Sequence, residues 1–157
     1  GLAYDPEMKR RVYEIYLEIL PDMLRGFPGV HELLGQLRAK GTLLAVASSA
    51  DRIKVDANLR GIGLDLDWFG AIVTGEDVAA RKPAPDIFLA AASRLGAVPS
   101  TCCVVEDALS GVAAAKAAGM RCVAVATSFP ESALREAGAD VVRPALAMVT
   151  ISDLGVA

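Results

Sequence analysis

The stretch Val104-Val105-Glu106-Asp107-Ala108-Leu109-Ser110-Gly111 decides the fold that this sequence predicts. A short apolar run ends in two adjacent carboxylates, and a helix rich in small residues is expected over residues 108–118. This pattern is typical of a buried strand and its following helix in an open α/β sheet, where ligands collect at the carboxyl ends of the strands. Two carboxylates at such an end suit a hard cation such as Mg²⁺. The alternative is that Asp107 merely caps the helix, which would leave Glu106 unexplained.

The composition indicates one globular domain. The chain has 157 residues, 54% hydrophobic and 22% charged, a balance that disordered proteins do not have. Its net charge of -3 offers no basic footprint for nucleic acid, and no apolar run approaches the roughly 20 residues of a membrane span. The odd cysteine count, with Cys102 and Cys103 adjacent and Cys122 apart, indicates buried free thiols in a reducing compartment.

Apolar spacing predicts two helices before the first strand. The first starts at Asp5-Pro6 and should end at Pro21, and the second covers residues 30–40. His31, the single histidine, lies at the start of the second helix and has no expected catalytic role. Strands then alternate with helices, which predicts a three-layer α/β fold with a parallel sheet. The expected strands cover residues 43–47, 71–74, 101–105, 122–125 and 140–142.

Each of three predicted strand ends carries polar side chains. Ser48 and Ser49 follow the first strand, and their hydroxyl and N–H groups suit phosphate, although a helix cap is the simpler interpretation of either alone. Lys82 follows the second strand and would neutralise a phosphoryl oxygen, although a lone lysine beside a turn is usually solvated. Together with Glu106 and Asp107, these residues predict a phosphate and metal site at one edge of the sheet.

The order of these motifs resembles the haloacid dehalogenase superfamily, and within it the β-phosphoglucomutase-like branch. An apolar strand before Ser48, the string Lys82-Pro83-Ala84-Pro85-Asp86 and the string from Val104 to Gly111 quoted above are similar to its second, third and fourth motifs, and the resemblance covers residues 26–142. It implies a Rossmann-like three-layer core, Mg²⁺ dependence and phosphoryl transfer through an aspartyl-phosphate. It also implies catalytic roles for Ser48 and Lys82, which would hold the phosphoryl group with Ser49 nearby, and Mg²⁺ binding by Glu106 and Asp107.

The resemblance also implies a division of the chain. Residues 1–25 would be the remnant of a helical cap, and residues 26–157 a core that lacks its first strand. A narrower resemblance, over residues 47–59 and 86–92, is to dehalogenase-like domains within larger chloroplast proteins of plants and algae. It implies a chloroplast location; without it, the cytoplasm is expected.

The first motif of the family, a strand ending in Asp-x-Asp, has no match here. Asp65-Leu66-Asp67 has the spacing, but no apolar strand leads into it, so Asp65 and Asp67 are expected to be loop acids. Without that nucleophile the covalent step is lost, and we expect the chain to be inactive alone. In this family the first strand lies between the strands ending at Ser48 and Glu106. Either an upstream segment or a partner chain supplies this strand, or the sheet is rearranged. An upstream segment is the favoured interpretation.

Two functions follow from these expectations. The first is a portion of a Mg²⁺-dependent phosphatase or phosphomutase-like domain that acts on a small phosphate ester. The second is a catalytically silent regulatory or interaction module of a larger protein, with thylakoid photoprotection as the setting if the narrower resemblance holds.

Overall fold

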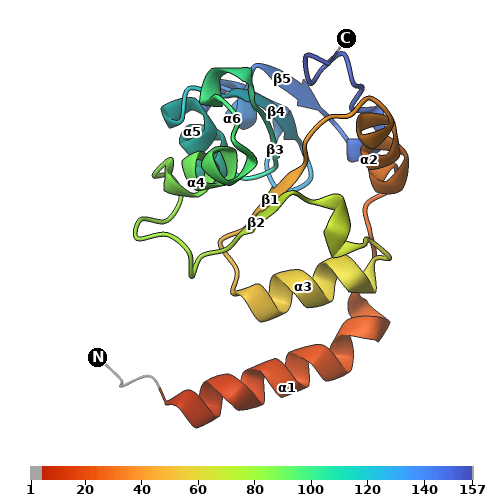
Figure 1. Ribbon diagram of the computed structural model, residues 1–157, viewed down its shortest axis with the longest axis vertical. Helices are drawn as coiled ribbons and strands as arrows, with labels where there is room; N and C mark the ends of the chain where they lie inside the picture. The colour runs from red at the N-terminus through yellow and green to blue at the C-terminus, as the bar shows by residue number, and fades with distance from the viewer. Residues whose placement is uncertain (1–4, 157) are drawn as a thin grey trace.

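Five short strands form two separate parallel sheets in the computed structural model, which describes residues 5–156 (Figure 1). One sheet pairs β1 with β2, and the other has the order β3-β4-β5. The strands are β1 (Ala45–Ala47), β2 (Ala71–Val73), β3 (Cys103–Glu106), β4 (Arg121–Val125) and β5 (Val141–Arg143). The alternation of strands and helices along the chain confirms the predicted α/β class with parallel strands.

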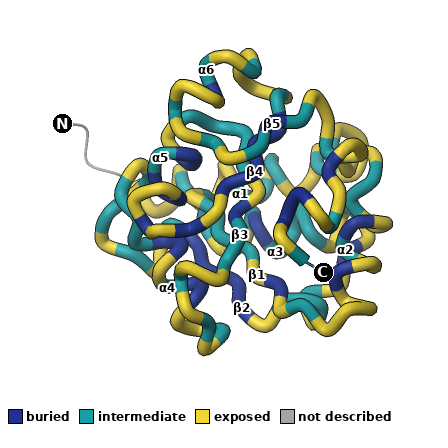
Figure 2. Tube along the Cα trace, turned by 90° about the horizontal axis from the view of Figure 1, so that it is seen from above, coloured by how far each residue is buried: buried dark blue, intermediate teal, exposed yellow. Residues whose placement is uncertain are grey.

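Helices cover both faces of the sheets and so produce three layers. One face packs against α4, α5 and α6, and the other against α2 and residues 146–156. Each face has its own hydrophobic core. Cys122 and Ala124 of β4 point into the core beneath α4, α5 and α6, whereas Val123 and Val125 point into the core beneath α2. A strand buried on both faces is apolar throughout, and Figure 2 shows buried residues along β2 and β4. The helices of these layers are α2 (Val30–Ala39), α4 (Asp86–Leu95), α5 (Leu109–Ala117) and α6 (Glu131–Glu136).

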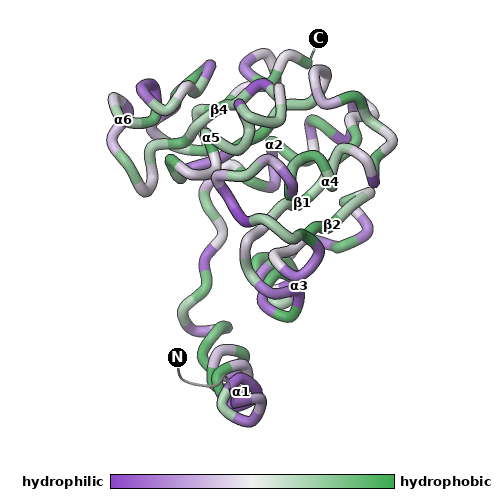
Figure 3. Tube along the Cα trace, turned by 90° about the vertical axis from the view of Figure 1, so that its left-hand side faces the viewer, coloured by the Kyte–Doolittle hydropathy of each residue, from purple (hydrophilic) through white to green (hydrophobic). Residues whose placement is uncertain are grey.

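The first helix, α1 (Pro6–Met23), lies apart from the sheets and rests on α3 (Arg52–Gly61) (Figure 3). Tyr13 donates a hydrogen bond to Asp51, and the Tyr16 hydroxyl donates to Asn58 Oδ1 at 2.6 Å. None of the residues of α1 is buried, so polar contacts rather than a core hold it against α3. Among the helices of residues 5–156, none combines the length and apolarity that a membrane span requires.

The prediction that Pro21 ends the first helix is wrong by two residues. α1 continues to Met23, and the N–H group of Leu24 closes its last turn on the carbonyl of Leu20 at 2.8 Å. Proline disrupts a helix because it lacks an N–H group and crowds the preceding turn. At Pro21 only the final turn lies beyond the proline, so the helix tolerates it.

Three expected strands are shorter in the structure. Residues 43 and 44 precede β1 rather than belong to it, Thr74 follows the end of β2, and Thr101 lies in the 3₁₀ helix η2 before β3. The cysteines also differ from expectation, because only Cys122 is buried, while Cys102 and Cys103 are half-buried. All three are free, and burial raises the pKa of Cys103 to about 11 and that of Cys122 to about 12. The 3₁₀ helices are η1 (Leu66–Trp68), η2 (Pro99–Thr101) and η3 (Leu146–Met148).

Candidate functional site

Lys82 connects the end of β1 with the end of β3. Its ammonium group forms an ion pair with the Glu106 carboxylate and lies 3.4 Å from the carbonyl oxygen of Ala47. The same Nζ atom lies 4.7 Å from the centre of the Phe88 ring. Only 12% of the Lys82 side chain and 9% of the Glu106 side chain are exposed, so the pair is largely shielded from solvent. The structure thus brings together the predicted lysine, the first strand end and one of the two predicted acids.

The Glu106 carboxylate is fixed from two sides. One oxygen pairs with Lys82, and the other accepts hydrogen bonds from the N–H groups of Asp107 at 2.8 Å and Ala108 at 3.0 Å. These N–H groups lie where α5 begins and favour a negative charge. A Cβ atom at Gly111 would lie 2.0 Å from Glu106 Cδ, so only glycine leaves room for this carboxylate. Glu106 therefore has a fixed orientation before any ligand binds.

Asp107 does not cap the helix that follows it. The residue at the cap position of α5 is Ala108, whose side chain makes no capping hydrogen bond. Instead, the Asp107 carboxylate accepts hydrogen bonds from the hydroxyl groups of Ser128 and of Thr127, the latter at 3.4 Å. These two hydroxyls follow β4, and the sequence prediction assigned them no role. The rule that polar residues at parallel strand ends share one edge would have found them.

Ser48 and Ser49 follow β1 beside the carbonyl that faces Lys82. Ser48 Oγ accepts a hydrogen bond from the N–H group of Ala50 at 3.2 Å, and its own N–H group bonds the carbonyl of Val73 at 3.0 Å. The residue at the cap position of α3 is Asp51, so neither serine is the helix cap. Ser49 is exposed at the same edge of the sheet. Their positions agree with the predicted phosphate role, which stays a prediction.

A second ion pair holds the loop that carries Lys82. Asp77 accepts hydrogen bonds at 2.7 Å from both the N–H and the hydroxyl group of Thr74, and Arg94 Nη2 donates to it at 2.6 Å. Arg94 also donates to the carbonyl of Ile72 at 2.9 Å. The Arg94 guanidinium and the Thr74 donors hold the pKa of Asp77 well below its usual range. These contacts join the loop to β2 and α4, and the Lys82–Pro83 peptide bond at its end is cis.

Glu106 and Asp107 match Mg²⁺ in donor type, because carboxylate oxygens are hard ligands. Within residues 5–156, however, no three His, Cys, Asp or Glu side chains are grouped closely enough to hold a metal ion. Lys82 and two N–H groups already engage Glu106, which leaves the half-buried Asp107 as the more accessible donor. The residues described therefore fit a Mg²⁺ ion that takes further ligands from water, phosphate or another acid.

Asp65 and Asp67 lie outside this site. Asp65 accepts a hydrogen bond from the N–H group of Asp67 at 3.1 Å at the start of η1, and both residues are exposed. Neither follows a strand, which agrees with the expectation that they do not form the first motif, although Asp67 lies within the short helix η1 rather than in a loop. His31 is also exposed, and its Nε2 atom lies 2.9 Å from the carbonyl oxygen of Ile62.

Comparison with known proteins decides the family. The family model described as haloacid dehalogenase-like hydrolase matches residues 3–125. The chain belongs to this family. It is 51% identical over 155 residues to the protein SUPPRESSOR OF QUENCHING 1, chloroplastic, of Arabidopsis thaliana, a match that covers 97% of this chain and 15% of that protein. This similarity agrees with the narrower resemblance to dehalogenase-like domains of larger chloroplast proteins.

Two further relatives of this haloacid dehalogenase-like chain define its branch. It is 38% identical over 133 residues to the phosphorylated carbohydrates phosphatase of Thermotoga maritima, covering 83% of this chain and 61% of that protein. A solved putative beta-phosphoglucomutase from Thermotoga maritima matches with a TM-score of 0.78 at 35% identity, over 90% of this chain and 67% of the solved one. The predicted β-phosphoglucomutase-like branch is confirmed. The chain spans less than two thirds of the length of both curated relatives.

Proposed function

We propose that residues 5–156 provide the phosphate-binding and metal-binding part of a phosphatase or phosphomutase-like domain that acts on a phosphorylated sugar. The observation that supports it most strongly is the position of Lys82 between the ends of β1 and β3. Relatives named as a phosphorylated carbohydrates phosphatase and a putative beta-phosphoglucomutase support the substrate class.

The roles of the residues follow from their chemistry. Lys82 neutralises an oxygen of the phosphoryl group, and Ser48 donates its hydroxyl to another, so that both stabilise the charge of the transferring group. Glu106 orients Lys82, and Asp107 offers a carboxylate to the metal. A bound Mg²⁺ ion would supply further positive charge next to the phosphoryl oxygens.

Three finer parts of the proposal concern regions beyond this site. The nucleophile and the missing strand come from an upstream segment or a partner chain. Residues 1–25 are the end of a cap that belongs to substrate recognition, of which residues 1–4 lie outside the described residues. The similarity to a chloroplast protein supports a chloroplast location.

A second candidate is a silent regulatory or interaction module. The state of the acid pair supports it. Lys82 and backbone N–H groups already engage the Glu106 carboxylate, and the described residues contain no third acid close enough to complete a metal site with Glu106 and Asp107. Hydrolysis of a phosphorylated sugar by the protein at its natural length, with and without Mg²⁺, separates the two candidates. Mg²⁺-dependent hydrolysis supports the enzyme, and its absence supports the silent module.

The phosphate site can be tested on this chain directly. We expect Lys82→Ala to weaken the binding of tungstate, a phosphate analogue, by at least about tenfold, because hydrogen bonds to charged groups contribute roughly 1.5–3 kcal/mol. The measurement is isothermal titration calorimetry in the presence of Mg²⁺, with circular dichroism to verify folding. Lys116→Ala is the matched control. Lys116 lies on α5, away from the site, and it also pairs with an acid, Asp140. Equal affinity of the Lys82→Ala variant and the wild type would remove Lys82 from the site.

A further inference from the structure

Two hydroxyl groups after β4 hold the Asp107 carboxylate from one side. Ser128 and Thr127 both donate hydrogen bonds to the same carboxylate oxygen, Oδ2, and the Thr127 bond is 3.4 Å long. β3 and β4 are neighbours in one parallel sheet, with Glu106 opposite Ala124, so the chain that leaves β4 passes beside Asp107. Side chains from the end of a fourth strand therefore reach the candidate site.

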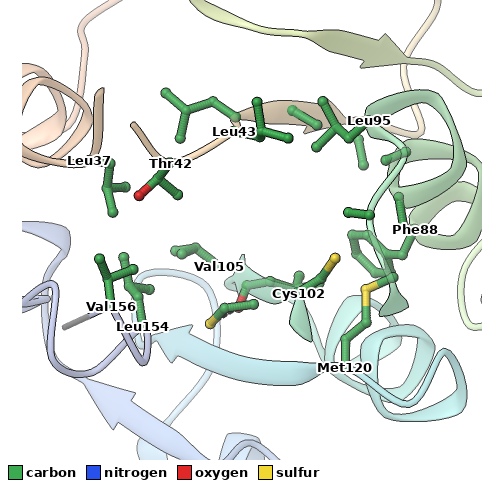
Figure 4. Close-up of a pocket in the computed structure, with 18 of the residues that line it drawn as sticks. Leu37, Thr42, Leu43, Phe88, Leu95, Cys102, Val105, Met120, Leu154 and Val156 are labelled. Atoms are coloured by element: carbon green, nitrogen blue, oxygen red, sulfur yellow. Dashed lines mark hydrogen bonds between the residues drawn. The ribbon is translucent and has the colours of Figure 1, made fainter. Parts of the chain in front are cut away.

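The second oxygen of this carboxylate is left open. Across the part of the chain that the structure describes, no hydrogen bond or ion pair reaches Asp107 Oδ1. Asp107 lines a cavity of about 270 Å³ together with Glu106 and Thr127. A larger cleft between β1 and β3 has mainly apolar walls, as Figure 4 shows, and Asp107 does not line it. Of these two spaces, only the smaller one has both acids in its wall.

The two acids have partners of different charge. Glu106 pairs with the ammonium group of Lys82, which compensates the negative charge of its carboxylate. Asp107, by contrast, has no ion pair within residues 5–156 and accepts hydrogen bonds only from neutral hydroxyl groups. A hydroxyl group orients a carboxylate without compensating its charge, so Asp107 keeps the negative charge that attracts a divalent cation.

We infer that Ser128, together with Thr127, is a positioning residue for the metal, because it holds Asp107 in the orientation in which the carboxylate binds Mg²⁺. This inference rests on the proposed function, since it takes Asp107 as a metal ligand. A ligand that is already held loses less conformational freedom when the metal binds, and this raises the metal affinity. Loss of a group that holds a metal ligand typically weakens metal binding by about 10–100-fold.

A purely structural role for the two hydroxyl groups is the alternative. However, backbone hydrogen bonds already fix this turn, because the N–H group of Thr127 donates to the carbonyl of Val125 at 2.9 Å. The following helix, α6, has Pro130 at its cap position, so neither hydroxyl caps it. Both Thr127 and Ser128 are also exposed. We therefore expect loss of the Ser128 hydroxyl to affect metal binding and not the stability of the fold.

Binding of Mn²⁺ tests this inference on the 157-residue chain. Mn²⁺ takes the same oxygen ligands as Mg²⁺, and the electron paramagnetic resonance signal of the free ion reports its binding without any enzymatic activity. We expect Ser128→Ala to weaken Mn²⁺ binding by at least about tenfold with an unchanged melting temperature. Ser128→Thr keeps the hydroxyl group and should restore most of the affinity. Ser132→Ala is the matched control, because Ser132 is also an exposed serine but lies on α6 and does not donate to Asp107.

Asp107→Ala separates failure of this inference from failure of the proposed metal site. If Asp107→Ala loses Mn²⁺ binding while Ser128→Ala keeps the wild-type affinity, the inference is overturned and the metal role of Asp107 stands. If the wild type does not bind Mn²⁺, or Asp107→Ala binds it equally well, the proposed metal role is overturned and the inference with it. A loss of affinity in Ser128→Ala that accompanies a lower melting temperature and is not restored in Ser128→Thr would show a structural role and would also overturn the inference.

Discussion

At the scale of single residues, the site depends on one close approach. Glu106 pairs with Lys82 only because its carboxylate lies over Gly111, where any side chain would collide with it. Gly111 lies five residues after Glu106, within the string that resembles the family's fourth motif, but the string does not show that this glycine makes room for the carboxylate. Predicting the contact requires the turn from β3 into α5, which the structure supplies.

Gly111→Ala should therefore move the Glu106 carboxylate, although Gly111 itself has no expected contact with a ligand. A Cβ atom 2.0 Å from Glu106 Cδ must displace the carboxylate, and such overpacking typically costs about 1–3 kcal/mol of stability. We expect a lower melting temperature together with weaker tungstate binding. Gly35→Ala is the control. A Cβ atom at Gly35, within α2, would lie more than 4 Å from every atom outside its own helix backbone. Alanine there should therefore stabilise the protein by about 0.5–1 kcal/mol. Unchanged stability and tungstate affinity in Gly111→Ala would contradict the proposed packing.

At the scale of elements, residues 146–156 are held against the sheet by a buried acid. Asp153 pairs with Arg143 of β5 and accepts the N–H group of Thr150 at 2.9 Å. Its own carbonyl accepts a hydrogen bond from Arg121 of β4 at 2.8 Å. The Arg143 guanidinium lowers the pKa of Asp153 to about 2. Leu146 and residues 154–156 of this segment also line an apolar cleft of about 590 Å³ between β1 and β3, so the attachment of the segment matters for both the core and the cleft.

The lowered pKa of Asp153 predicts a specific pH dependence. A carboxylate with a depressed pKa in the folded state stabilises the protein above its unfolded pKa, and that stabilisation is lost as pH falls through the folded value. We expect the wild type to lose more stability than Asp153→Asn between about pH 5 and pH 2, measured by urea denaturation. Asp56→Asn is the control, because Asp56 pairs with Arg52 of the same helix and both side chains are partly exposed. Parallel pH profiles for the wild type and Asp153→Asn would contradict this attribution.

The same scale shows why some elements could be predicted and others could not. Apolar runs and glycine or proline boundaries were enough to locate β2, β4 and the helices, because these signals are local. The late start of β1 and the half-buried state of Cys102 and Cys103 depend on an open edge between strands far apart in the sequence. The partners of Asp107 likewise come from the loop after β4, 20 and 21 residues later.

At the scale of the whole molecule, the sheet is divided where the residues proposed to bind phosphate and metal meet. Lys82 spans the division, and the apolar cleft lies directly between the strands it connects. The resemblance to the family predicted a missing strand at this place, and two separate sheets with unpaired inner edges agree with it. The candidate site thus lies where the two sheets face each other.

The most direct test of the shared site is an NMR titration of the labelled chain with tungstate in the presence of Mg²⁺. The residues at three strand ends should respond together: the backbone signals of Ser48 and Ser49, of Lys82, and of Asp107 should shift along one binding curve. Shifts that are absent from these positions, or that follow separate binding curves, would contradict a single phosphate and metal site.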